Sequence, residues 1–261
     1  MGREYNTFLF GVLIMDYGFA SRLLAKKCLE RVFHTIINPP LESFAEHTMW
    51  TSQEEVLKNL PTVFDSATNI GHLMDEYDQL NQVLERRYRE ITLTYPMRFA
   101  IENTTSFFIY ALVRSIRPNV ILETGVANGH STYFILNALA NNKAGKLHSI
   151  DVNAKAGALI QEDERDRWDL SIMPGFLTRK RDFKGAIDRI GTIDVFFHDS
   201  NHFYYWQNFE YNSVLPKIRQ GGYLLSDDVD YSYAFLDLSK KQSLEPTFIT
   251  DYRKFFGFVR V

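Results

Sequence analysis

The sequence predicts an α/β fold, in which a mostly parallel sheet is covered by helices, closed by an antiparallel hairpin and preceded by a helical region. From about residue 95, short apolar runs typical of buried strands alternate with amphipathic segments typical of helices. Near the C-terminus, residues 247–250 and 255–261 are two strand-like segments with a short charged connection, which is typical of a hairpin. We therefore predict two regions, a helical N-terminal appendage or cap at 1–94 and a core at 95–261.

Three segments of the N-terminal region have helical periodicity. Residues 17–37 repeat apolar side chains against a basic face, and a proline pair at 39–40 ends this amphipathic helix. We interpret the basic face as solvated, with contact to a partner or an anionic lipid surface as the alternative. Ser52 followed by Glu55 predicts a capping box that opens a short helix, and residues 70–91 predict a longer, charge-rich helix.

The core region begins with a helical run and continues with four buried-strand patterns. The strand patterns are short apolar runs at 120–122, 147–150, 194–197 and 223–225. Amphipathic segments separate them, and this alternation predicts strands that are mostly parallel.

Composition and charge restrict the class of function. The 261 residues carry 29 Lys and Arg against 32 Asp and Glu, a formal net charge of −3, which disfavours a nucleic-acid binder driven by bulk positive charge. The single cysteine, Cys28, cannot form an internal disulfide, and the apolar run 8–15 is too short for a membrane helix of about 20 residues. We expect a cytoplasmic protein without an integral membrane segment. A cleaved signal peptide is disfavoured by Glu4 beside Arg3, and myristoylation by Asn6, where the pattern needs Ser or Thr.

A glycine-bearing turn follows the first strand pattern of the core, in the run Glu123-Thr124-Gly125-Val126-Ala127-Asn128-Gly129-His130-Ser131. Ligands of open α/β sheets bind at such turns, because glycine lets the backbone approach and a helix N-terminus offers free N–H groups. The spacing lacks the third glycine of the pyrophosphate-binding pattern, and a carboxylate at Glu123 suits a cationic amino-acid group better than a pyrophosphate. A tight turn without a ligand is the alternative.

Acidic residues follow the other strand patterns. Asp151 ends the second strand, where this architecture places a carboxylate on ribose hydroxyls. Asp199 follows the third strand and Asp227-Asp228 the fourth, so three carboxylates are expected to converge in a site that suits Mg²⁺ or Mn²⁺. Helix capping and solvated loop ends are the alternatives. His202 is expected to face the same cleft as a base with a pKa near neutrality, or else to be a packed or surface histidine.

These motifs resemble one family. The E-x-G-x-x-x-G-x-S turn, the strand-ending Asp151, and the blocks I-D-V-F-F-H-D-S-N-H and G-G-Y-L-L-S-D-D are similar to those of class I S-adenosylmethionine-dependent methyltransferases. Within that class the chain looks most like small-molecule O-methyltransferases related to macrolide-sugar methyltransferases and, more distantly, to catechol O-methyltransferase. The match runs from about Tyr95 to the C-terminus, and it implies a Rossmann-like, seven-stranded, mostly parallel sheet.

The resemblance also implies residue roles. The cofactor S-adenosylmethionine would contact Glu123, Gly125, Gly129, Ser131, Asp151 and Gly175. A divalent metal would be held by Asp199, Asp227 and Asp228. His202 would be the base, aided by Asp199, and the metal would hold two oxygens of the acceptor while the acceptor attacks the sulfonium methyl group. Many class I members place an acid after the third strand to bind adenine, whereas here Phe176 follows Gly175, so the adenine contacts are left open.

The leading hypothesis is a metal-assisted O-methyltransferase for a small hydroxylated acceptor such as a sugar or glycoconjugate. A nicotinamide-dependent oxidoreductase is disfavoured by the missing third glycine. The remaining alternative is a non-catalytic, methyltransferase-like binding or assembly module. The run Phe203-Tyr204-Tyr205-Trp206 would either stack on a sugar or pack its helix, and the aromatic-rich appendage leaves a homo-oligomer open.

Overall fold

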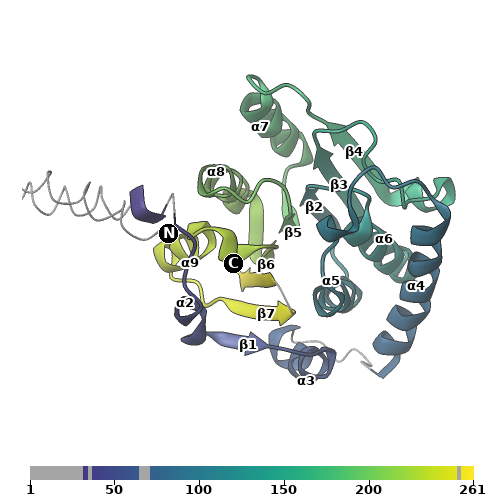
Figure 1. The fold of residues 1–261 in the computed structure, drawn as a ribbon, viewed down its shortest axis with the longest axis horizontal. Helices are drawn as coiled ribbons and strands as arrows, with labels where there is room; N and C mark the ends of the chain where they lie inside the picture. Colours follow the sequence, from purple (N-terminus) through teal and green to yellow (C-terminus); the bar gives the residue numbers. More distant parts are fainter. Residues whose placement is uncertain (1–31, 35–36, 65–70, 252–253) are drawn as a thin grey trace, which may run out of the picture.

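The computed structural model describes residues 32–34, 37–64, 71–251 and 254–261. The described chain forms one eight-stranded sheet in the order β1-β7-β8-β6-β5-β2-β3-β4 (Figure 1). The strands are β1 (Thr48–Trp50), β2 (Val120–Thr124), β3 (Lys146–Asp151), β4 (Trp168–Ile172), β5 (Ile193–His198), β6 (Ile218–Ser226), β7 (Thr247–Asp251) and β8 (Lys254–Arg260).

The sheet is parallel except at one strand. β8 pairs antiparallel with both β6 and β7, and every other pairing in the described sheet is parallel. This confirms the α/β Rossmann-like fold with a C-terminal antiparallel hairpin. The strand order switches at β2, because β3 and β4 follow on one side of it and β5 and β6 on the other. The carboxyl ends of β2 and β5 therefore lie next to each other at the switch point, where such sheets bind ligands.

Two strands were not among those expected from individual sequence patterns. β4 is an edge strand in which buried or half-buried side chains alternate with exposed ones, so it lacks the continuous apolar run of a central strand. β1 has three residues and only Trp50 is buried, too short a segment for a pattern to stand out. β1 also comes from the N-terminal region and pairs with β7, so that region contributes to the sheet. The region boundary at residues 94 and 95 stays a prediction.

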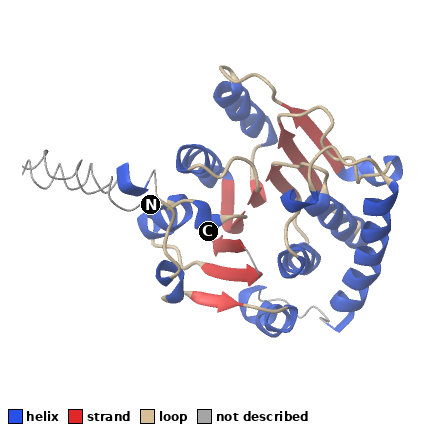
Figure 2. Ribbon diagram, in the orientation of Figure 1, coloured by secondary structure: helices blue, strands red, loops and turns tan. Residues whose placement is uncertain are grey.

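Helices cover both faces of the sheet (Figure 2). One group gathers along one side of the sheet in Figure 1: α3 (Gln53–Phe64), α4 (Gly71–Glu90), α5 (Asn103–Ile116) and α6 (His130–Asn142). The other side carries α2 (Glu42–Ala45), α7 (Arg179–Ile190), α8 (Tyr204–Val214) and α9 (Ala234–Gln242). Short 3₁₀ turns complete the chain: η1 (Met97–Phe99), η2 (Glu162–Arg167), η3 (Leu215–Lys217) and η4 (Val229–Tyr231).

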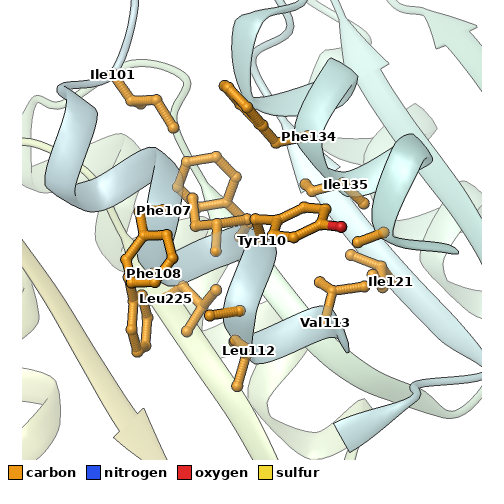
Figure 3. Packing of buried hydrophobic residues seen from close by; sticks show 14 of the residues in the cluster. Ile101, Phe107, Phe108, Tyr110, Leu112, Val113, Ile121, Phe134, Ile135 and Leu225 are labelled. Carbon is orange, nitrogen blue, oxygen red and sulfur yellow. The ribbon is translucent and has the colours of Figure 1, made fainter. Parts of the chain in front are cut away.

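The larger of two apolar clusters centres on α5. Its residues are apolar nearly all round and almost all buried, the pattern of a helix enclosed by other elements. Figure 3 shows Phe107, Phe108 and Tyr110 of α5 beside Phe134 of α6 and Leu225 of β6, which belong to the same cluster. This packing fixes α6 against α5, and with it the turn that joins β2 to α6.

Two of the three helices predicted before residue 95 are present, and the capping hydrogen bonds of the first of these differ from the prediction. The N–H of Glu55 donates to Ser52 Oγ at 3.2 Å, which confirms Ser52 as the cap of α3. The Glu55 carboxylate accepts the N–H of Thr51 rather than that of Ser52. α4 runs over Gly71–Glu90, as the pattern at 70–91 predicts. Most of the helix predicted at 17–37 lies outside the described residues.

In the part of the chain that the structure describes, no helix is both long enough and apolar enough to cross a membrane.

Candidate functional site

A cavity of about 590 Å³ opens at the carboxyl ends of the central strands. Its wall includes Thr124 and Gly125 after β2, Asp151 after β3, and Asp199 after β5. Residues near the end of β6 and the start of β8 close the other side. The motifs picked out from the sequence therefore converge on one cleft, at the position expected for a parallel sheet.

The turn after β2 depends on a glycine at position 125. Gly125 has φ +83°, and a Cβ built there would lie 1.9 Å from the backbone oxygen of Asp199. A side chain would therefore collide with the strand end that carries the acidic motif. Gly129, also at positive φ, lies outside the cavity lining, where a Cβ would approach Ile160 and Gly157.

Glu123 does not reach the cavity. Its side chain is fully buried and accepts hydrogen bonds from Ser131 Oγ at 2.6 Å, Thr132 Oγ1 at 2.8 Å and Ser149 Oγ at 2.7 Å. Burial raises the pKa of Glu123, and the three hydroxyl donors oppose that shift. Glu123 and Ser131 thus join β2, β3 and α6 behind the cavity wall, and neither lines it. The expected contact of this pair with an amino-acid group is not brought about in the structure.

Asp151 lines the cavity and also shapes it. Oδ2 accepts the N–H of Val126 at 2.8 Å and of Ala127 at 3.2 Å, and Oδ1 accepts the N–H of Asn153 at 2.8 Å. The carboxylate therefore fixes the glycine turn of the neighbouring strand. Oδ1, which accepts a single N–H, retains a lone pair for a hydroxyl donor in the cavity.

The loop after β4 differs from expectation. Gly175 is outside the cavity lining, and Phe176 is 84% exposed. On that side the apolar wall comes from Met173 and Phe183, with Arg179 beside them. Phe176 is not part of that wall.

The aromatic run at the start of α8 divides between two surroundings. Phe203 and Trp206 line the cavity. Tyr204 donates its hydroxyl to Asp237 at 2.9 Å, and Tyr205 lies under the Lys180 ammonium, 3.9 Å from the ring centroid. Only half of the run is therefore available to a ligand in the cavity.

Beside Phe203 and Trp206, the cavity floor holds a cluster of charges from the ends of β5 and β6 and the start of β8. His202 Nδ1 lies 3.0 Å from Asp228 Oδ2, and His202 Nε2 lies 3.5 Å from Asp199 Oδ1. The Lys254 ammonium lies 3.1 Å from Asp227 Oδ2 and 3.5 Å from Asp228 Oδ1. The three acids expected from the sequence do converge, but two cationic side chains lie among them.

These contacts govern the protonation of the cluster. Burial alone lowers the pKa of His202, but its close contacts with the carboxylates of Asp199 and Asp228 outweigh burial and raise the pKa to about 10. Burial and the charge of Asp227 raise the pKa of Asp199 to about 8. The two carboxylates stabilise the protonated form of His202, so its pKa is raised above the near-neutral value expected from the sequence.

The lysine is held in its charged form in the same way. Burial lowers the pKa of Lys254, and the charges of Asp227 and Asp228 reverse this and raise it. Burial raises the pKa of Asp228, but His202 and Lys254 outweigh burial and lower it. The pKa of Asp227 is raised by burial and by the charge of Asp228.

A three-carboxylate metal site does not fit this arrangement. Within the described ranges, no group of three or more His, Cys, Asp and Glu side chains has the geometry to hold a metal ion. Asp227 and Asp228, two of the three expected ligands, share the ammonium of Lys254. A divalent ion among the same oxygens would meet that positive charge at short range.

A second polar network supports the cavity wall from α8. The Glu210 carboxylate accepts Thr124 Oγ1 at 2.6 Å, His198 Nδ1 at 2.7 Å, Ser200 Oγ at 3.0 Å and Trp206 Nε1 at 2.6 Å. His198 is fully buried and outside the cavity lining, as expected for a structural residue. Glu210 joins α8 to the ends of β2 and β5.

Sequence reasoning missed Lys254 and Glu210. Lys254 begins β8 next to the connection of the hairpin, where a charged residue is ordinary. Glu210 is inside a helix, and the only signal was its i,i+4 spacing from Trp206. The role of each residue depends on contacts with elements that are distant in sequence.

Comparison with known proteins is consistent with this geometry. No curated protein matches the chain. A protein family described as "Methyltransferase domain" matches residues 122–229, from within β2 to the start of η4. Residues 122–229 are therefore similar to a methyltransferase domain. The match covers the glycine turn and all three acids of the cluster, and it confirms the enzyme class expected from the sequence.

Solved structures share the fold of this chain. An O-methyltransferase from Bacillus cereus in complex with SAH is 17% identical over 70% of this chain and 91% of that chain, with a TM-score of 0.55. The O-methyltransferase TomG from Streptomyces achromogenes, in complex with SAM, is 16% identical over 81% of this chain and 99% of that chain, with a TM-score of 0.53. A methyltransferase from Geobacter sulfurreducens is 15% identical over 70% and 89%, with a TM-score of 0.51. At such identities the likeness shows the fold alone.

Proposed function

We propose that the protein is an S-adenosylmethionine-dependent O-methyltransferase acting on a small hydroxylated molecule. The observation that carries the proposal is one cavity joining Gly125 and Asp151, at the cofactor end, to Asp199 and His202, at the charged end. The methyltransferase match over residues 122–229 supports the reaction class, and the names of solved relatives support oxygen as the acceptor atom.

In this proposal the cofactor occupies the side of the cavity formed by β2 and β3. S-adenosylmethionine supplies, when bound, an electrophilic methyl group on a positively charged sulfur. Asp151 Oδ1 has a lone pair free for a ribose hydroxyl, and Met173 and Phe183 provide an apolar surface for a planar base. Gly125 lets the ligand approach the backbone. The roles of Glu123, Ser131, Gly129 and Gly175 are not part of the proposal, since none of them lines the cavity.

The acceptor occupies the charged side. In its ionised form Asp199 takes up the hydroxyl proton at a carboxylate oxygen, and its pKa, raised to about 8, makes it a stronger base than an ordinary carboxylate. His202 stays protonated between Asp199 and Asp228 and fixes the orientation of the Asp199 carboxylate. We therefore assign the base to the Asp199–His202 pair rather than to His202 alone. No step passes through a divalent metal, which the cluster does not fit.

The acceptor class is inferred from the cavity rim. Phe203 and Tyr231 line the cavity, and their rings meet edge to face with centroids 5.7 Å apart. Both side chains are partly exposed, at 62% and 46%, so a ring-shaped acceptor can pack on them. A sugar or glycoconjugate, and membership of the macrolide-sugar branch, remain predictions.

Cofactor binding and turnover test the proposal. We expect calorimetric titration with S-adenosylmethionine to give saturable one-site binding to the wild-type protein. Asp199→Asn should bind the cofactor but form S-adenosylhomocysteine about 10²- to 10⁴-fold more slowly with a panel of phenols, sugars and other hydroxylated acceptors. Asp188→Asn, on the surface and paired with Lys217, is the matched control and should leave both readouts unchanged.

Two results would count against the proposal. Absence of cofactor binding to wild type would remove the enzyme assignment and favour a methyltransferase-like binding module. Normal turnover by Asp199→Asn would remove Asp199 from the mechanism while leaving the reaction class in place.

A further inference from the structure

Lys254 is the first residue of β8, and its side chain lies across the end of β6. The ammonium contacts Asp227 Oδ2 at 3.1 Å and Asp228 Oδ1 at 3.5 Å, and the side chain is 16% exposed. The exposed part faces the cavity, whose lining includes Lys254 together with Asp199 and Asp228. One cation is thus positioned both inside the acidic cluster and on the cavity surface.

The acidic cluster already contains a cation in contact with two of its three carboxylates. The Lys254 ammonium lies against Asp227 and Asp228, and the His202 ring lies between Asp199 and Asp228. A lysine ammonium has three N–H donors in different directions. Asp227 and Asp228 take two of them, so the third is available to an oxygen atom in the cavity.

We propose that Lys254 is the resident cation of this acidic cluster, in place of a divalent metal ion, and binds the acceptor oxygen during methyl transfer. For this catalytic role the inference rests on the proposed function, whereas the exclusion of a metal ion by Lys254 does not. The ammonium polarises the acceptor hydroxyl while Asp199 takes its proton, so the developing negative charge on the oxygen lies next to a fixed positive charge. Lys254 thereby performs the electrostatic part of what a bound dication does in metal-assisted transfer.

Metal titration tests the inference without needing the acceptor. Mn²⁺ is the probe, followed by calorimetry and by electron paramagnetic resonance on protein dialysed against EDTA. Wild type should show no stoichiometric Mn²⁺ binding. Lys254→Met keeps the length of the side chain without its charge and should bind one Mn²⁺ at least about tenfold more tightly than wild type, because a like charge at contact distance is removed. Lys254→Arg keeps the charge and should resemble wild type.

A double variant locates any Mn²⁺ site that is gained. Lys254→Met combined with Asp228→Asn should lose the binding that Lys254→Met gains, because Asp228 is then no longer an anionic ligand. Circular dichroism and urea unfolding establish whether each variant is folded. If Lys254→Met does not fold, the wild-type titration decides the question.

Several outcomes would overturn the inference. One is stoichiometric Mn²⁺ binding by wild type that weakens in Asp227→Asn, because the metal ion would then displace the Lys254 ammonium from this carboxylate. Another is a folded Lys254→Met protein that gains no Mn²⁺ site. A third is methyl transfer by EDTA-treated wild type that requires added Mn²⁺ or Mg²⁺. A failure of cofactor binding would show separately, in the S-adenosylmethionine titration, and would count against the proposed function instead.

Discussion

His130, the first residue of α6, is a half-buried titratable side chain that contacts α4 and α5. Its Nδ1 lies 2.8 Å from the hydroxyl of Tyr88, and its Nε2 lies 3.1 Å from Ser106 Oγ. Burial lowers the pKa of His130 to about 4. A neutral imidazole with one donor and one acceptor nitrogen satisfies both hydroxyls, whereas an imidazolium would place an uncompensated charge in an apolar cluster.

The depressed pKa predicts acid sensitivity. Below the unfolded pKa of about 6.5 the unfolded chain binds a proton that native His130 does not bind until about pH 4, so stability falls as pH falls through that interval. Between pH 7 and pH 5 the wild type should lose about 2 kcal/mol more unfolding free energy than His130→Gln, measured by urea denaturation. The pKa of His198 is also lowered by burial, but this residue is present in both proteins and its effect cancels. Equal losses in the two proteins would contradict the assignment to His130.

At the scale of elements, the position of α8 determines the shape of the cavity. α8 carries Trp206, which lines the cavity, and Glu210, whose carboxylate receives donors from the ends of β2 and β5. Apolar packing alone would let a short helix slide along the sheet. A buried carboxylate with donors on two strands fixes its position, because displacement would leave a charge unsatisfied.

Glu210→Gln tests this role of the element. The amide places an N–H₂ group among the donors to Glu210, so we expect a loss of about 2–4 kcal/mol of unfolding free energy in urea. Cofactor affinity should also fall, because Thr124 and Trp206 line the cavity. Glu162→Gln is the matched control: its side chain is 96% exposed and should cost less than about 0.5 kcal/mol. A small effect of Glu210→Gln would show that packing alone holds α8.

At the scale of the whole molecule, the region before residue 95 shares one core with the elements that follow it. The larger apolar cluster contains residues from β1, α3 and α4 that pack with α5 and α6: Trp50, Val56, Leu60, Leu73, Tyr77 and Leu84. Each buried side chain of this size contributes about 2 kcal/mol, so together they are comparable with the total stability of a typical domain, about 5–15 kcal/mol.

Removal of residues 1–94 should therefore prevent stable folding of the remainder. We expect the fragment 95–261 to show no cooperative urea transition and to lose its near-ultraviolet circular dichroism. The full-length chain is the reference. A fragment that unfolds cooperatively at the same urea concentration as the full chain would show that the predicted boundary separates independent folding units.

Local patterns were enough for the central elements and for the place of the site. The apolar runs at β2, β5 and β6 are buried on both faces, so continuous hydrophobicity identifies them. The hairpin joins β7 and β8, two segments adjacent in sequence, so local patterns were enough to predict it. Because parallel strands align their carboxyl ends, the motifs after β2, β3, β5 and β6 also predicted a single cleft, and Gly125, Asp151, Asp199 and His202 do line it.

By itself, the sequence determined the fold class, the edge of the sheet that carries the cavity and the convergence of Asp199, Asp227 and Asp228. Only the tertiary structure decided what those residues contact. It buries Glu123 among hydroxyls, places Lys254 against two of the acids and encloses His202 between carboxylates. Periodicity reports which face of an element is buried, whereas the charge state of a side chain depends on atoms supplied by distant segments, here chiefly from β8. The chemistry of this site was therefore settled by long-range packing.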